Sequence, residues 1–288
     1  AISLESRSMA LLQKSKPNFR KLLKIAPLIL GVLALFFIYF PIFWLILLSF
    51  SAEPLTGVPG GWHFDWYIDM VYGADRREGE AFVGDFQLKE PLIKSISIAT
   101  LTSVLCIISA VLVGRVLPNM KHQGLLLFGF LVPLMVPGIV VGMAMFLFFR
   151  IGLGIKMGTW SLALAHFVWA FPFCLLVILV VVSRLDQRVL EAARDLGASK
   201  IQTFFQIELP IIKPGIFAAG FFGFLLSFNE LPFSIFMRKG DMTLPIYLWI
   251  QSGAHNSSVP LIFALSTIIT LISMIITYLI VRLGFKNG

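Results

Sequence analysis

One acidic residue, Glu230, stands inside a long apolar stretch of this sequence. If that stretch crosses a bilayer, a charge near its centre costs about 2.5 to 3.5 kcal/mol on insertion scales and therefore needs a reason. Asn229 precedes the acid, and Pro232 follows it and should open the local hydrogen-bond ladder, which exposes backbone carbonyls. A carboxylate beside an amide and free carbonyls suits transient binding of an ammonium group. The structural alternative is that Glu230 pairs with a basic or amide group of another subunit.

Aromatic side chains form a second candidate group. Trp169 and Phe171 stand beside Pro172, with His166 one helical turn before Trp169 and Ala170. They can line a substrate path by cation–π contact, or they can be ordinary helix packing.

Signatures of catalysis are missing from the sequence. It has no His-Glu-x-x-His, no paired aspartates within apolar stretches and no Gly-x-Ser-x-Gly, and its four histidines and two cysteines lack the spacing of metal ligands. No G-x-x-x-x-G-K-[ST] loop is present to cradle phosphates. We therefore expect neither a catalytic residue nor a metal site, and no cofactor bound by this chain.

Composition indicates the elements that must hold these residues. Of 288 residues 58% are hydrophobic and 13% charged, and the mean hydropathy is +0.91, which excludes a water-soluble fold. Since about 20 apolar residues span a bilayer as a helix, the sequence predicts an all-α membrane protein with six transmembrane helices. The predicted spans are 25–50, 95–117, 124–149, 160–182, 214–236 and 259–281.

Basic residues predict the orientation. If the N-terminus is cytoplasmic, 15 of the 23 Lys and Arg lie inside and eight outside, so positive-inside bias places both termini in the cytoplasm. Residues 1–24 are then a cytoplasmic tail or a short interfacial helix, and residues 25–288 form the transmembrane domain. Within this domain, residues 51–94 form an external loop and residues 183–213 a cytoplasmic loop. This bias and the attraction of anionic lipid explain the net charge of +8 without nucleic acid.

The third span carries helix breakers. Pro133 and Pro137, with Gly138 and Gly142, predict either a broken, mobile helix or ordinary packing kinks.

The cytoplasmic loop 183–213 predicts a helix, a turn and a second helix. Asp186 can cap a first helix with Val189, Ala193 and Leu196 at helical spacing, and Gly197 can end it in the left-handed conformation. Ser199 can cap a second helix that stops at Pro210. Exposed charges at Glu191, Arg194 and Asp195 can pair with a partner.

This loop resembles the signature loop of binding-protein-dependent ABC importer permeases. The matching positions are Glu191, Ala192, Ala193, Gly197, Ile207, Leu209 and Pro210. The resemblance implies the type I importer (MetI-like) fold of a bacterial inner membrane, with a cytoplasmic coupling helix and an extra first helix. It also implies that these residues, with Asp195, dock on an ATPase and that Gly197 is the turn of a lever. The implied partners are a second, homologous permease subunit, two cytoplasmic ATPases that bind ATP and Mg, and an external solute-binding protein.

Segments on both sides of this loop resemble most closely the spermidine/putrescine permeases. They are LGIKMGTWSLALAHFVWAFPF before it and LSFNELPFSIF, TLPIYLW and ALST after it. Branches that carry ferric iron or aminophosphonates remain alternatives. In polyamine permeases the positions matching Asn229 and Glu230 are usually both acidic, so the amide here weakens the case for a polycation. A secondary transporter or channel would also fit six spans, but it leaves the signature loop unexplained.

Overall fold

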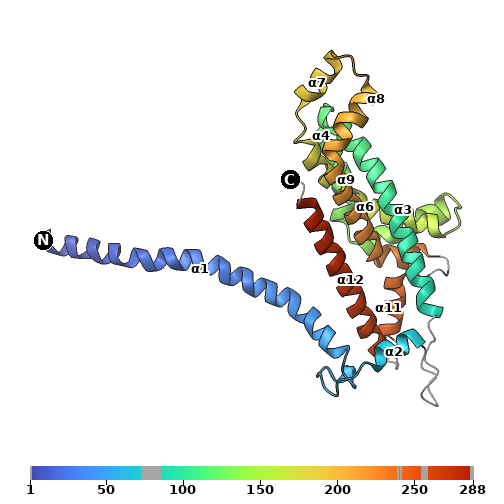
Figure 1. The fold of residues 1–288 in the computed structure, drawn as a ribbon, viewed down its shortest axis with the longest axis horizontal. Helices are drawn as coiled ribbons and strands as arrows, with labels where there is room; N and C mark the ends of the chain where they lie inside the picture. Colours follow the sequence, from blue (N-terminus) through green and yellow to red (C-terminus); the bar gives the residue numbers. More distant parts are fainter. Residues whose placement is uncertain (1, 73–85, 239, 241, 254–258, 286–288) are drawn as a thin grey trace. The chain divides into compact units, whose positions relative to one another are not determined.

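The structure is a computed structural model that describes residues 2–72, 86–238, 240, 242–253 and 259–285 (Figure 1). These residues form α-helices with short 3-10 and π turns and no strand, which confirms the predicted all-α class. Part of the predicted external loop, residues 73–85, lies outside the described residues. The chain divides into two compact units, Ala1–Met70 with Val259–Ile276, and Val71–Ser258 with Thr277–Gly288.

The first unit begins with helix α1 (Ile2–Leu48), in which the predicted tail and the first span are one continuous helix. A 3-10 turn η1 (Pro54–Thr56) and helix α2 (Asp65–Tyr72) follow. The indole N–H of Trp66 donates to the carbonyl of Ser51 at 2.8 Å, and the hydroxyls of Ser49 and Tyr67 lie 2.6 Å apart. These bonds tie α2 back to the end of α1.

Three long helices form the core of the second unit: α3 (Phe86–Val116), α6 (Thr159–Val182) and α9 (Leu209–Phe228). Small residues permit close contact between these helices. This is typical of membrane helices, because the hydrophobic effect does not drive their association within lipid. A Cβ at Gly215 of α9 would lie 2.6 Å from Val181 of α6, and one at Gly220 would lie 2.6 Å from Ile107 of α3. The buried cluster between the helices includes Cys106, Ala110 and Cys174.

The third predicted span is broken. A 3-10 turn η2 (Leu117–Asn119) leads to α4 (Gln123–Met135), and α5 (Gly138–Leu147) then departs at 99°. A π-helical turn η3 (Phe148–Gly152) ends this segment. The break falls at Val136 and Pro137, whereas Pro133 lies inside α4. Of the two alternatives left by the sequence, the structure therefore shows the broken helix.

The fourth and fifth spans are joined by α7 (Gln187–Asp195), α8 (Lys200–Thr203) and a π turn η4 (Phe204–Glu208). The predicted stop at Pro210 is wrong, because α8, η4 and α9 form one helical segment from Lys200 to Phe228. Pro210 follows the π turn η4 almost directly, where the regular hydrogen-bond ladder of the α-helix is already interrupted. That segment ends at Phe228, and a separate short helix α10 (Pro232–Met237) covers the end of the stretch predicted as span 214–236.

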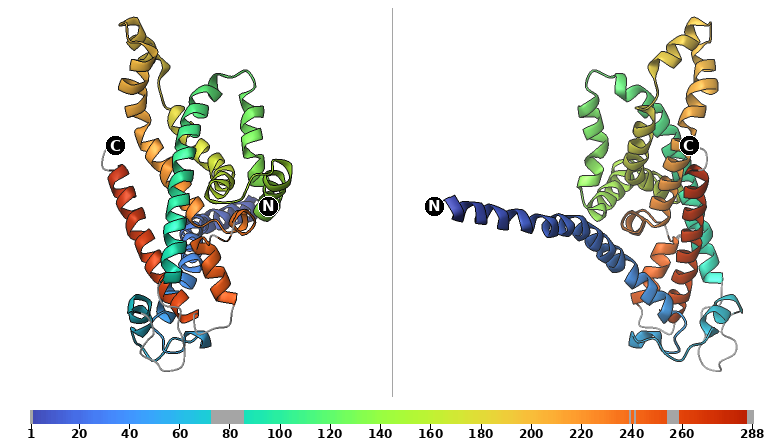
Figure 2. Two further views of the ribbon diagram at one scale, coloured as in Figure 1. Left: turned by 90° about the vertical axis from the view of Figure 1, so that its right-hand side faces the viewer. Right: turned by 60° about the vertical axis from the view of Figure 1, so that its left-hand side comes forward.

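Helices α11 (Leu244–Gly253) and α12 (Val259–Phe285) complete the chain. Five helices of the described residues are long and apolar enough to cross a membrane, and the bent pair α4 and α5 makes six if it counts as one span. Both views of Figure 2 show α7 and α8 projecting past the end of α3, at the tip of the segment that continues into α9. The same segment thus connects the loop 183–213 with the helix break that contains Glu230.

Candidate functional site: the coupling loop and the broken helix

Helix α7 is closed at both ends by the residues that the sequence analysis selected. Asp186 Oδ1 accepts the backbone N–H of Arg188 at 2.9 Å, which confirms the predicted cap. At the other end Gly197 has φ +90°, and its N–H donates to Arg194 while the N–H of Ala198 donates to Ala193. These two bonds make a Schellman motif, in which the left-handed residue is usually glycine.

The next helix begins at Ser199, also as predicted. Its hydroxyl accepts the N–H of Gln202 at 3.2 Å, and the side chain of Gln202 accepts the N–H of Ser199 at 2.8 Å. This capping box fixes the direction in which α8 leaves the turn.

The apolar side chains of this loop remain largely uncovered in the described structure. Leu196 is 90% exposed, Ile201 is 71% exposed and Val189 is exposed as well, whereas Leu190 is buried. The predicted docking residues Glu191, Ala192, Asp195 and Gly197 are exposed, and Ala193 is half-buried. Ile207 and Leu209 are half-buried and Pro210 is exposed, all on the helical segment below the turn.

An ion pair that the sequence analysis missed lies at the base of the loop. Arg115, in the last turn of α3, contacts Glu208 through two N–H groups, at 2.5 and 2.8 Å. Its guanidinium also lies 4.1 Å from the centre of the Phe204 ring. Glu208 stands at an unspecified position of the signature, between Ile207 and Leu209, so no pattern singled it out.

Glu230 lies in the break between α9 and α10, as the position of Pro232 predicted. Its side chain is buried, with 6% exposed, and Oε1 accepts the N–H of Phe233 at 3.1 Å. The backbone carbonyl of Glu230 accepts a hydrogen bond from the hydroxyl of Ser234 at 2.9 Å. The expectation that this carbonyl would be free is therefore wrong. Within the described residues no Lys, Arg or His forms an ion pair with Glu230.

His166 of α6 joins the two sides of the break. Nδ1 lies 2.8 Å from the hydroxyl of Ser227, at the end of α9, and Nε2 lies 2.8 Å from the hydroxyl of Ser234, in α10. The histidine is 1% exposed, so it is a satisfied core residue and not a lining group within this chain.

The other path candidates occupy different surroundings. Phe171 is buried and packs against Phe130 and Phe167, which is the packing alternative. Trp169 is half-buried and packs against Phe173 and Phe233. Phe233 is the residue whose backbone N–H donates to Glu230. Asn229 is exposed, and its side-chain amide donates to the carbonyl of Leu225. Asn229, Glu230 and Trp169 are thus close in the fold, whereas Phe171 belongs to the core.

Helix α10 is held against α5, so the two broken helices support each other. A Cβ at Gly142 of α5 would lie 3.2 Å from Cα of Phe233 and 3.3 Å from the carbonyl oxygen of Pro232. A methyl group at this position would have to push these backbones apart by a few tenths of an ångström. The segment after Pro137 therefore packs directly on the segment after Glu230.

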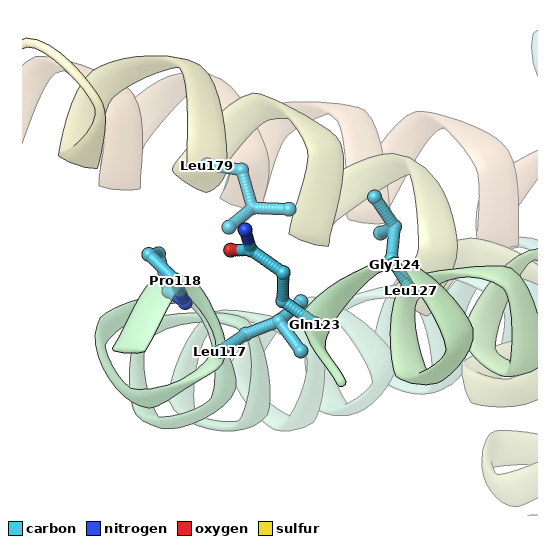
Figure 3. Close-up of a pocket in the computed structure, with 6 residues that line it drawn as sticks. All are labelled: Leu117, Pro118, Gln123, Gly124, Leu127 and Leu179. Atoms are coloured by element: carbon cyan, nitrogen blue, oxygen red, sulfur yellow. The ribbon is translucent and has the colours of Figure 1, made fainter. Parts of the chain in front are cut away.

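A hollow of about 250 Å³ lies where α3 turns into α4 (Figure 3). The amide of Gln123 points between apolar groups, and the lining consists of Leu117, Pro118, Gln123, Gly124, Leu127 and Leu179. None of these residues comes from the loop 183–213 or from the Glu230 break, so the hollow is separate from both.

Comparison with known proteins identifies the class. Residues 103–284 match the family of binding-protein-dependent transport system inner membrane components, and the chain belongs to this family. It is a permease subunit of an ABC importer, and the family assignment made from the signature loop is confirmed.

Individual relatives cover nearly the whole chain. The putrescine transport system permease protein PotI of Escherichia coli K12 is 30% identical over 278 residues, which are 92% of this chain and 93% of PotI. The spermidine/putrescine transport system permease protein PotC of Haemophilus influenzae is 27% identical over 260 residues, 88% of this chain and 93% of PotC.

A solved structure agrees in fold. A chain of a bacterial ABC transporter involved in the import of the acidic polysaccharide alginate superposes with a TM-score of 0.68 at 16% identity, over 91% of this chain and 96% of that one. The predicted type I importer permease fold is thereby confirmed.

Proposed function

We propose that α7 and the turn at Gly197 dock on a cytoplasmic ATPase subunit and transmit its movement to the membrane helices. The observation that carries this proposal is the exposed apolar surface of the loop, formed by Val189, Leu196 and Ile201. A rigid helix end with uncovered apolar groups and flanking charges suits a protein partner. The loop stands at the tip of a continuous helical segment, so a push on it reaches the break at residues 229–231.

The variant Gly197→Asp tests this docking. A side chain at φ +90° adds roughly 1 kcal/mol or more of strain and places a charge in the docking surface. We expect the complex to assemble but to lose the link between ATP hydrolysis and uptake, measured in proteoliposomes with the binding protein present.

The matched control for that test is Gly154→Asp. Gly154 has φ +65° and nothing within 4 Å of a built Cβ, so the control carries the same kind of strain outside the loop. Coupling equal to wild type in Gly197→Asp would refute the docking role.

The full importer in this proposal has further parts. They are a second, homologous permease subunit, two ATPases that hold ATP and Mg, and an external solute-binding protein. Both termini of this permease face the cytoplasm.

We further propose a polyamine of the spermidine or putrescine kind as the transported solute, with Glu230 on its path. The support is that a buried carboxylate has no cationic partner in the described part of the chain. An ammonium group of a passing substrate, or a group of the second permease subunit, would supply the missing partner of this carboxylate. The relatives PotI and PotC are named for putrescine and spermidine/putrescine transport.

Uptake by the whole complex decides between solutes. Radiolabelled putrescine and spermidine should enter vesicles only with ATP and the binding protein, and unlabelled aminophosphonate or ferric iron should not compete. ATP-dependent uptake of a labelled aminophosphonate or of ferric iron, with no uptake of polyamines, would assign the chain to the corresponding branch of the family.

A further inference from the structure

The base of the cytoplasmic loop contains a weak point in an otherwise regular helical segment. Between α8 and α9 the backbone makes a π turn, in which the N–H of Leu209 donates to Phe204, five residues back. Such turns are rare and interrupt the regular ladder of an α-helix. A force applied to α7 and α8 would bend the segment here unless something braces the turn.

Arg115 spans this turn from the neighbouring helix. Its guanidinium binds the carboxylate of Glu208, the last residue of the π turn, and covers the ring of Phe204, the first. Two parallel N–H contacts to one carboxylate fix direction as well as distance. One side chain of α3 therefore holds both ends of the weak point.

The ion pair is built into the protein interior on the acidic side. Glu208 is 5% exposed, so the loss of Arg115 would leave a buried charge without this partner. A buried ion pair can often be replaced by apolar side chains without loss of stability. Stability alone therefore gives little reason for this pair.

Below the turn, α9 is already fixed to α3. The hydroxyl of Ser103 in α3 donates to the carbonyl of Gly220 at 2.7 Å, and a Cβ at Gly220 would lie 2.6 Å from Cδ1 of Ile107, also in α3. The 29 residues from Lys200 to Phe228, at about 1.5 Å each, form a segment about 43 Å long. If the π turn is braced, α7, α8, α9 and α3 can move as one body.

We propose that Arg115 and Glu208 are positioning residues for energy coupling, which brace the π turn so that displacement of α7 and α8 moves α3 and α9 together. This inference rests on the proposed docking of α7 on an ATPase. Phe204 completes the brace by supporting the guanidinium plane. The proposed role requires no contact of these three residues with substrate or ATP.

The test compares Glu208→Gln with the apolar double variant Arg115→Met/Glu208→Met in the whole complex. Glu208→Gln keeps the shape of the side chain and removes the charge, and the double variant removes both charges. At equal amounts of assembled complex, we expect the ratio of ATP hydrolysed to solute imported to rise at least about fivefold in both variants. A change of about fivefold is the low end of the usual coupling between two sites. A purely structural pair would change the amount of assembled complex and not this ratio.

A distance measurement gives a second readout. Spin labels on the exposed residues Lys200 and Asn119 report the distance between the start of α8 and the end of α3. In wild type we expect one narrow distance distribution with and without ATP, and in both brace variants a broad one. If the double variant fails to assemble, the Glu208→Gln distribution decides, and a narrow one overturns the brace.

The Gly197→Asp variant, measured in parallel, separates this inference from the proposed function. Wild-type ratios in the brace variants, with uncoupling in Gly197→Asp, would overturn the brace and leave the docking intact. Wild-type ratios in all of them would overturn the docking as well.

Discussion

At the residue scale, the break at residues 229–231 shows how a membrane helix can be interrupted with its polar groups paired. Glu230 accepts from Phe233, and His166 contacts Ser227 and Ser234 on opposite sides of the break. Irregular backbone at membrane depth persists only with such internal partners or beside water. The carboxyl group of Glu230 is the acidic group in this arrangement, and it is the group that our proposal uses to hold a cation.

The charge of Glu230 yields a prediction with two opposite variants. Glu230→Gln retains an oxygen for the N–H of Phe233 but loses the charge, so polyamine uptake should fall about ten- to a hundredfold, as for one contact worth about 1.5 to 3 kcal/mol. Asn229→Asp adds a charge at an exposed neighbour and should leave polyamine uptake equal or higher. Uptake is compared at equal amounts of assembled complex. Unchanged uptake in Glu230→Gln would make Glu230 a pairing residue only.

At the element scale, contact between α3, α6 and α9 depends on residues without side chains. Gly215 faces Val181 so closely that a built Cβ would lie 2.6 Å from one methyl carbon and 2.9 Å from Cβ of the valine. Valine is stiff at χ1, so this neighbour cannot turn away easily. The path from the coupling loop to the break therefore runs through a tightly packed contact.

Two alanine substitutions test this packing. Gly215→Ala should lower the stability of the complex by about 1 to 3 kcal/mol, the usual cost of overpacking. Gly129→Ala in α4, where nothing lies within 4 Å of the built Cβ, should be neutral or raise stability by up to about 1 kcal/mol. The measurement is the midpoint of thermal denaturation of the purified complex. Equal shifts in both variants would contradict the close packing at Gly215.

At the scale of the whole molecule, the chain is a multi-pass membrane subunit whose orientation we predict from the distribution of basic residues. Fifteen basic residues lie in segments predicted to face the cytoplasm: Arg7, Lys14, Lys16, Arg20, Lys21, Lys24, Arg115, Lys121, Arg184, Arg188, Arg194, Lys200, Lys213, Arg282 and Lys286. Exposed apolar side chains along α1, such as Phe37 and Leu28, suit contact with lipid.

Thiol labelling checks this orientation. With Cys106 and Cys174 replaced, a single cysteine at the exposed Val58 should react with an impermeant reagent added to intact spheroplasts, and one at the exposed Lys200 should react only after lysis. Reaction at residue 200 in intact cells would reverse the topology.

The sequence by itself determined the class, the family and the helix ends within the loop 183–213. Several features depend only on neighbours within a few residues, so the sequence alone predicts them. They are the long apolar stretches, the caps at Asp186 and Ser199 and the left-handed turn at Gly197. The break at Glu230 was also legible, since Pro232 acts on adjacent backbone.

Tertiary structure alone decided which distant residues meet. Arg115 and Glu208 are 93 positions apart, and His166 is 61 positions from Ser227, so no periodicity connects them. The continuation of helix through Pro210 likewise depended on a π turn upstream that propensity does not signal. Phe171 could be placed in the core only once Phe130 and Phe167 were seen to surround it, because an aromatic residue in a lipid-facing, path-lining or buried position has the same local sequence.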